Sequence, residues 1–382
     1  MVDTAANISG REVHGRAVAA GLAVGCLLTW NVSNVGAVAD PLAAAYGTSL
    51  VVIGLLTTAL FLTHLAAQLP AGIWSDRFGP HRVGLAACVA AAAGNAVLLL
   101  DASIGVAAAG RLVVGLGSGA GFVAGLDLVR AGRGGAMLQG LYGGATMAGG
   151  GLALLILPPL TAATSWRAPF ASGLVLALAA AVLVLGVRGL RPVGRTGRGV
   201  MRDAALLPLG ALQVTSFGLA VIAGGWIVPL LERNGAATAA AGALGSFVLL
   251  AGIVTRPLGG ALAHRWPAHR RPLVGGSLVA VAAGALLLAL GGPLWLSALG
   301  SLALGLAAGL PFAVVFEAAQ RLRPDAPAAA IAFVNGCAVL AIVIGTPLVG
   351  LGFDLPGDGV AGFAAIALLA LAGLPFVGRL RS

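Results

Sequence analysis

Long apolar stretches recur along the whole chain, separated by short polar turns rich in Arg, Gly and Pro. Each stretch is close to the roughly 20 residues that an α-helix needs to cross the hydrocarbon core of a bilayer. Only 9% of the residues are charged, against roughly 25% in soluble domains, so an all-α membrane protein is the expected fold class. Twelve helices are predicted, at 17–39, 50–71, 83–100, 104–126, 136–160, 168–187, 206–231, 239–262, 273–291, 294–317, 329–352 and 359–378.

All 22 basic residues are arginines, and their placement indicates the orientation in the membrane. Cytoplasmic loops carry the excess of positive charge. With the N-terminus inside, eighteen arginines fall in cytoplasmic segments and two, Arg167 and Arg233, fall outside. We therefore expect a multi-pass protein of the cytoplasmic membrane with both termini in the cytoplasm. The net charge of +10 is assigned to this asymmetry at the lipid bilayer and not to nucleic-acid binding.

The longest and most basic connection divides the sequence into two halves of six helices each. It predicts a cytoplasmic linker at 188–205, between an N-terminal six-helix bundle at 1–187 and a C-terminal one at 206–382. The segment GLGSGAGFVAGLD, which begins at Gly115, aligns without gaps with GLAAGLPFAVVFE, which begins at Gly305.

A second pair of segments repeats between the halves. QLPAGIWSDR, which begins at Gln68, aligns with RPLGGALAHR, which begins at Arg256. Parallel repeats of this kind predict pseudo-twofold symmetry and a solute site between the halves, near the middle of the membrane.

The turn after the second helix reads GIWSDRFGPHRVG. It resembles the loop signature of the major facilitator superfamily, G-x-x-x-D-R-x-G-x-x-R, with Gly72, Asp76, Arg77, Gly79 and Arg82 in register. Helix number, linker and repeats extend the resemblance over nearly the whole chain. It implies the major facilitator fold, secondary transport, and a gating role for these five residues. The alternative interpretation is that the arginines only anchor helix ends at the interface.

A degenerate copy of the signature occurs in the second half. Gly260 and Arg265 are kept, while His264 replaces the acidic residue. We expect this half to latch more weakly, or in a pH-dependent way.

Charged residues near the loops after the fourth and tenth helices resemble the partners that close cytoplasmic gates in this family. They are Asp127 and Arg133 in the first half and Glu317 in the second. We expect Asp127 to pair with Arg77 or Arg82 when the inner gate is shut; the alternative is that it only anchors the helix at the interface.

Arg256 is the residue expected to bind the solute. It precedes Arg265 by nine residues, which places it roughly 12–15 Å deep, near the midplane of the bilayer. The segment RPLGG resembles the second-half signature of nitrate/nitrite porters, in which an Arg in this helix holds the anion. Gln68 stands where those porters have a second Arg, and the single cation fits a singly charged anion or a zwitterion. The alternative is a packing cation satisfied by carbonyls beside Pro257.

Other polar residues lie within the apolar segments. His64 lies one turn before Gln68, and Asn31 and Asn34 share a face of the first helix, so these side chains could bind a polar solute or join helices. Arg111 fits a pattern, R-x-x-x-G-x-G, that resembles the family's fourth helix. It is expected to face a cavity or a partner, or to extend toward the outer interface.

These features predict a secondary active transporter that moves a small polar or anionic solute by alternating access. An ion gradient or a counter-solute would drive it. The alternative is a proton-coupled drug or metabolite efflux antiporter, which commonly uses a buried carboxylate; no acidic residue lies clearly mid-membrane here. The chain has no nucleotide loop, metal-spaced His/Cys set or catalytic triad, so neither enzymatic activity nor a cofactor or metal is expected. We expect a monomer to be functional.

Overall fold

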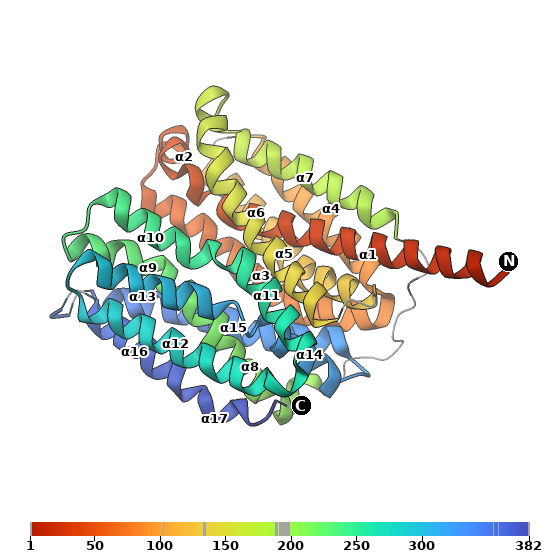
Figure 1. Cartoon of the computed structure of the whole chain (residues 1–382). Helices are drawn as coiled ribbons and strands as arrows, with labels where there is room; N and C mark the ends of the chain where they lie inside the picture. Colours follow the sequence, from red (N-terminus) through yellow and green to blue (C-terminus); the bar gives the residue numbers. More distant parts are fainter. Residues whose placement is uncertain are drawn as a thin grey trace. The chain divides into compact units, whose positions relative to one another are not determined.

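The computed structural model describes residues 2–101, 103–132, 135–187, 190, 199–353, 355–357 and 359–380, and every long element in them is a helix (Figure 1). The helices are α1 (Val2–Ser33), α2 (Ala39–Tyr46), α3 (Leu50–Phe78), α4 (Pro80–Leu98), α5 (Ile104–Ala131), α6 (Ala136–Ala163), α7 (Ala168–Leu185), α8 (Leu207–Gln213), α9 (Leu219–Arg233), α10 (Thr238–Leu250), α11 (Gly252–Arg265), α12 (Arg270–Leu290), α13 (Leu294–Ala308), α14 (Phe312–Leu322), α15 (Pro327–Leu351), α16 (Val360–Ala372) and α17 (Leu374–Val377).

Twelve helical segments of the described residues are long and apolar enough to cross a membrane, which confirms the predicted all-α membrane fold. Several boundaries differ from the prediction, those of α1 and α3 among them. α1 ends at Ser33 instead of 39, because a 3₁₀ turn at Gly36–Val38 leads into α2. α3 continues beyond 71 to Phe78, since a basic residue in its last turn, Arg77, interacts favourably with the negative end of the helix dipole.

The chain forms two compact units, each with one short segment from the opposite half of the sequence. Unit 1 comprises Met1–Gly134, Ala145–Val200 and Arg323–Ala332. Unit 2 comprises Gly135–Gly144, Met201–Leu322 and Phe333–Ser382. Of the predicted linker at 188–205, Leu190 and the residues from Gly199 onward are described, and the others lie outside the described residues. The division into bundles at 1–187 and 206–382 stays a prediction.

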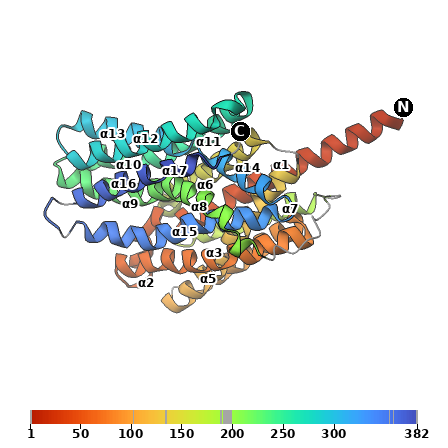
Figure 2. The same ribbon diagram turned by 90° about the horizontal axis from the view of Figure 1, so that it is seen from below.

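In unit 1, α5 packs against α1, α3 and α4, and the first turns of α1 extend beyond the other helices of the unit (Figure 2). Glycines allow the backbones to approach closely. A Cβ on Gly94 would lie 2.7 Å from the carbonyl oxygen of Gly110, and one on Gly117 would lie 2.6 Å from that of Ala87. Such contacts provide the van der Waals packing that joins helices where no hydrophobic effect can do so.

Unit 2 is packed in the same way, with α12 against α13 and α16. A Cβ on Gly284 would lie 2.6 Å from the carbonyl oxygen of Gly300. Apolar side chains from several helices, including Leu219 and Phe363, form the buried core beside this contact.

Three spans of unit 2 are interrupted partway along. A π-helical turn at Val214–Gly218 joins α8 to α9, and α10 meets α11 at Ala251. A turn at 309–311 separates α13 from α14, where Pro311 supplies no N–H to an α-helical ladder. Non-helical backbone at membrane depth is tolerated only where protein or a cavity surrounds it, and it is frequent at functional sites.

Candidate functional site

A buried arginine lies where the interrupted spans of unit 2 meet. Arg256 is on α11, one turn after the junction at Ala251, and only 4% of its surface is exposed. Its guanidinium carbon lies 4.4 Å from the ring centroid of Phe312 and 5.0 Å from that of Phe217. Nη1 donates to the carbonyl oxygen of Gly143 at 3.1 Å. The guanidinium is therefore held by two aromatic faces and a carbonyl of α6.

Each aromatic neighbour of Arg256 occupies a helix interruption. Phe217 belongs to the π-helical turn, and Phe312 is the first residue of α14. A desolvated cation over an aromatic face gains about 2 kcal/mol. The interruptions thus bring together groups that offset part of the cost of a charge within the membrane.

Glycines leave the space that Arg256 and its neighbours fill. A Cβ on Gly143 would lie 2.7 Å from the ring of Phe312 and 2.8 Å from Cδ of Arg256. A Cβ on Gly309 would lie 3.3 Å from Cγ of Arg256, and one on Gly140 would meet the carbonyl of Arg256. Small residues at these positions are therefore part of the site.

Gln68, the position that aligns with Arg256, belongs to a buried polar cluster in unit 1. Its Nε2 donates to Nε2 of His64 at 2.8 Å. With that nitrogen accepting, Nδ1 of His64 carries the proton and donates to Oγ of Ser118 at 3.0 Å. Oε1 of Gln68 is buried and has no hydrogen-bond partner. The cluster therefore presents one unused acceptor.

Arg111 is fully buried in a second polar cluster of unit 1. Nη1 donates to the backbone oxygen of Asn31 at 2.8 Å and to Oδ1 of Asn34 at 3.0 Å, and Nε donates to the carbonyl oxygen of Leu56 at 3.3 Å. The structure therefore brings together Arg111, Asn31 and Asn34, which the sequence placed in separate roles. Nη2 of Arg111 is buried and has no hydrogen-bond partner.

Asparagine side chains extend the cluster of Arg111. Nδ2 of Asn95 donates to Oδ1 of Asn31 at 2.8 Å, and Nδ2 of Asn34 donates to the carbonyl oxygen of Pro169 at 3.1 Å. The two amides that we expected to bind a solute thus bind α4, α5 and α7.

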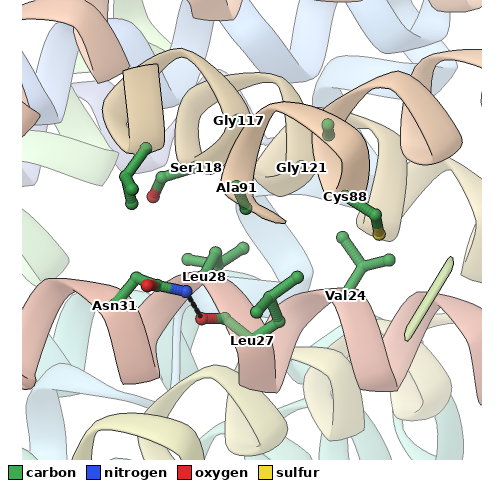
Figure 3. A pocket seen from close by; sticks show the side chains of 11 residues that line it. Val24, Leu27, Leu28, Asn31, Cys88, Ala91, Gly117, Ser118 and Gly121 are labelled. Atoms are coloured by element: carbon green, nitrogen blue, oxygen red, sulfur yellow. Dashed lines mark hydrogen bonds between the residues drawn. The ribbon is translucent and has the colours of Figure 1, made fainter. Parts of the chain in front are cut away.

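A small internal cavity separates the two polar clusters of unit 1 (Figure 3). Asn31 and Ser118 lie at one end of it, and Val24 and Cys88 lie at the other. Its volume of about 10 Å³ suits a single water molecule.

Asp76 joins α3 to the first turns of α15, the part of that helix that belongs to unit 1. Its Oδ1 accepts from the backbone N–H of Ala328 and its Oδ2 from that of Ala329, each at 3.0 Å. Gly72 makes this contact possible, because a Cβ there would lie 2.8 Å from Cα of Ala329. Gly79, with φ of 92°, then turns the chain into α4. The signature carboxylate thus caps the N-terminus of α15.

Asp127 has partners that differ from the expected ones. Its Oδ1 accepts from Nε of Arg130 at 2.6 Å, and its Oδ2 accepts from the hydroxyl of Ser75 at 2.6 Å. Arg130 is favoured because it lies one turn further along the same helix.

The two arginines of the first signature copy are at the surface. Arg77 and Arg82 are exposed, and Arg77 lies over the ring of Phe78 with 5.1 Å to its centroid. Arg133 lies outside the described residues.

The second copy of the signature packs in the corresponding way in unit 2. A Cβ on Gly260 would lie 3.0 Å from Cα of Met137, at the start of α6. His264 lies at this helix end too, since a Cβ on Gly135 would be 4.0 Å from its Nδ1. Arg265 is exposed and lies over the ring of Trp266.

Glu317 is shared by two arginines of unit 2. Oε2 lies 2.9 Å from Nη2 of Arg270, and Oε1 lies 2.7 Å from Nη2 of Arg321. An acidic residue midway along α14 is therefore ion-paired with α12 and with its own helix.

Several residues around these sites were not predicted from the sequence. Phe217 and Gly143 approach Arg256 only through tertiary packing, and Ser118 and Asn95 each complete a cluster from a different helix. A signal existed for Phe312, which belongs to the repeated segment that begins at Gly305.

Within the described ranges, no group of three or more His, Cys, Asp or Glu side chains could hold an ion. The three cysteines, Cys26, Cys88 and Cys337, are not joined by disulfides.

Comparisons with known proteins relate the chain to a family. The sequence model described as the Major Facilitator Superfamily matches residues 21–346. A search of curated protein sequences found no match.

Three solved structures illustrate the likeness of fold. The human organic anion transporter MFSD10 (TETRAN) is 16% identical, with a TM-score of 0.70, over 95% of this chain and 99% of that chain. The fucose:proton symporter FucP of E. coli is 16% identical, with a TM-score of 0.70, over 94% and 98%. The proton:xylose symporter XylE is 13% identical, with a TM-score of 0.75, over 96% of each chain. The family match and the twelve spans together show that the chain belongs to the Major Facilitator Superfamily and is a multi-pass membrane protein of the secondary-transporter class.

Proposed function

We propose that the protein moves a small polar or anionic solute across the cytoplasmic membrane by alternating access, and that Arg256 binds the solute. The observation that carries the proposal is a guanidinium buried within a span among interrupted helices. In transporters, discontinuous helices near mid-membrane often form solute and ion sites.

The surroundings of Arg256 favour an anion or the carboxylate of a zwitterion. Its partners include a carbonyl oxygen and two aromatic faces, which carry only partial negative charge. A unit negative charge about 4 Å away would add roughly 4 kcal/mol of Coulomb energy at an effective dielectric constant of about 20. The faces of Phe217 and Phe312 also fix the guanidinium plane, which reduces the entropy lost on binding.

Gln68 and His64 are proposed as solute-binding residues of unit 1. Oε1 of Gln68 is buried without a hydrogen-bond partner, so it could accept an N–H or O–H of a polar solute. His64 holds the Gln68 amide and is itself held by Ser118. For Asn31 and Asn34 we propose a different role, since their hydrogen bonds position Arg111 and join helices.

Gating is proposed for the two signature copies. The cap of Asp76 on α15 would form in one conformation and be released in another, with Gly72 allowing the contact. In unit 2, Gly260 and Arg265 would act at the start of α6, and Glu317 would act through its two arginines. For Arg77 and Arg82, which lie at the surface, we propose that they anchor the helix ends at the cytoplasmic interface.

An ion gradient or a counter-solute would supply the energy. The similar structures belong to an organic anion transporter and to two proton:sugar symporters, so their names do not decide between an anion and a neutral polar solute. The choice of an anion or zwitterion rests on Arg256.

Uptake by proteoliposomes tests this proposal. Radiolabelled small carboxylates, amino acids and sugars would be offered with and without imposed proton or sodium gradients. Accumulation that is lost in Arg256→Gln, but kept in the matched surface variant Arg16→Gln, supports the proposal. Saturable binding without accumulation under any gradient would instead indicate a receptor, and transport indifferent to Arg256→Gln would remove the proposed site.

A further inference from the structure

A large cavity in unit 2 lies apart from Arg256. It has a volume of about 760 Å³ and is lined by residues of several helices and of the C-terminal segment of the described chain. Its basic lining residues are Arg270, Arg321 and Arg379. Arg321 follows Phe312, the neighbour of Arg256, by nine residues of α14, which is roughly 13 Å along a helix axis. Arg256 and its neighbours Phe217 and Phe312 are not among the lining residues, so the cavity is a separate site from the one proposed for the solute.

The cavity carries more positive than negative charge. Glu317 is the carboxylate paired with Arg270 and Arg321, at 2.9 and 2.7 Å. Arg379 is exposed. Three guanidiniums against one carboxylate leave a local net charge of +2.

Arg270 and the C-terminal segment beside Arg379 are held in place by hydrogen bonds. Arg270 is the most buried of the three; its side chain is 9% exposed, and its Nε donates to the carbonyl oxygen of Ala263 at 3.3 Å. Arg271 donates from Nε to the carbonyl oxygen of Leu380 at 2.7 Å, which ties the C-terminal segment next to Arg379 to the start of α12. The cavity thus combines one buried arginine, Arg270, with two exposed ones, Arg321 on α14 and Arg379 on a C-terminal segment that is fixed to α12.

The remaining lining is apolar. It includes Leu209, Val314, Leu322 and Leu380. A ligand that suits both parts has an anionic group for the guanidiniums and a hydrophobic portion for the leucines and valine. Guanidinium groups bind phosphate with two parallel hydrogen bonds, and basic pockets between spans on the cytoplasmic side bind anionic lipid headgroups.

We propose that this cavity binds a phosphate-bearing anion, through Arg379 and Arg321, and that its occupant is the headgroup of an anionic phospholipid. The proposal does not depend on which solute the protein transports. A volume of about 760 Å³ lies within the usual range of ligand sites. Phosphate neutralises the charge that Glu317 leaves uncompensated, and the acyl chains continue along the apolar lining.

The test measures thermal unfolding of the purified full-length protein in a neutral detergent. Phosphatidylglycerol, phosphatidylcholine and inorganic phosphate would be titrated separately. Because binding to the folded state stabilises by mass action, an occupant of the cavity raises the melting temperature in a saturable way. We expect phosphatidylglycerol to do so at concentrations at which phosphatidylcholine does not.

Two variants test whether the rise in melting temperature comes from binding in the cavity. Arg379→Gln combined with Arg321→Gln should weaken the apparent affinity for phosphatidylglycerol by at least about tenfold, since each lost charge-assisted hydrogen bond costs about 1.5 kcal/mol or more. Arg16→Gln, an exposed arginine of unit 1, is the matched control and should change nothing.

The outcomes separate the possible sources of the phosphate. A shift by inorganic phosphate that depends on Arg379 and Arg321, without one by the lipid, keeps the anion site and assigns it a soluble ligand. Equal shifts by the two lipids, or equal affinities in the double variant and the wild type, overturn the proposal. If the double variant does not fold, native mass spectrometry of the wild type replaces the titration. Equal retention of phosphatidylglycerol and phosphatidylcholine would then overturn the proposal.

Discussion

The carboxylate of Asp76 accepts a hydrogen bond at 3.0 Å from the backbone N–H of Ala328, which lies 252 residues further along the chain. Its second oxygen binds the N–H of Ala329 at 3.0 Å. The N-terminus of a helix carries unsatisfied N–H groups and a partial positive charge, so a carboxylate from another helix is a favourable cap. The signature in the first half of the sequence is thereby joined to α15 in the second.

Removal of this cap should lower stability. We expect Asp76→Asn to reduce the free energy of unfolding by about 1 kcal/mol, because an amide keeps one acceptor and loses the charge, and Asp76→Ala by about 2 kcal/mol. Thermal unfolding in detergent measures both. Asp40→Asn, at an exposed carboxylate of the same unit, is the control. Unfolding temperatures that do not differ among the three variants would contradict a cap.

The second half offers the reverse experiment. His264 lies at the start of α6 as Asp76 lies at the start of α15, but it supplies no negative charge. His264→Asp should therefore raise stability by about 0.5 kcal/mol through the helix dipole. His264→Asn, which is uncharged, separates the charge from the change of shape. A fall in the melting temperature for the aspartate variant alone would show that α6 does not need an anion here.

Gly143 should be sensitive to a single methyl group. In Gly143→Ala, a Cβ would lie 2.7 Å from the ring of Phe312 and 2.8 Å from Cδ of Arg256, so one of them must move. We expect solute affinity to fall by about tenfold, since a well-packed site responds to small displacements with about 1–3 kcal/mol. Gly276→Ala is the matched control, because nothing lies within 4 Å of its Cβ. Equal affinities for the two variants, measured by uptake or thermal shift, would contradict the geometry of the site.

Arg111 should not be replaceable by lysine. Its guanidinium donates at once to Asn31, Asn34 and Leu56 from a planar fork that an ammonium group cannot reproduce. We expect Arg111→Lys and Arg111→Gln to lower the free energy of unfolding by similar amounts, about 2–3 kcal/mol. In both variants the buried carbonyls lose charge-assisted hydrogen bonds. Full stability of the lysine variant in thermal unfolding would show that charge alone matters.

The spans could be predicted because bilayer thickness fixes the length of an apolar helix and leaves few alternatives. The repeat also carried structural information. Gly72 and Gly260 align in sequence, and each packs against the first turn of a helix from elsewhere in the chain, α15 or α6.

Side-chain partners were less predictable, because they depend on which helices become neighbours. Asn31 and Asn34 share a face, as their spacing indicates, yet that face meets Arg111. In the structure Asp127 pairs with Arg130 of its own helix, and the pairing with Arg77 or Arg82 that we expect for a shut inner gate stays a prediction. The interruptions that place Phe217 beside Arg256 leave little trace in a continuous apolar segment.

Thermal stabilisation of the purified protein measures whether Arg256 binds a small anionic or zwitterionic solute. A panel of small anions, amino acids, sugars and cationic drugs would be titrated against the wild type, Arg256→Gln and the surface control Arg16→Gln. We expect an anion or zwitterion to raise the melting temperature of the wild type and the control, in a concentration-dependent way, and to leave that of Arg256→Gln unchanged. Equal stabilisation of all three proteins by a cationic drug would show that Arg256 is not the solute-binding residue.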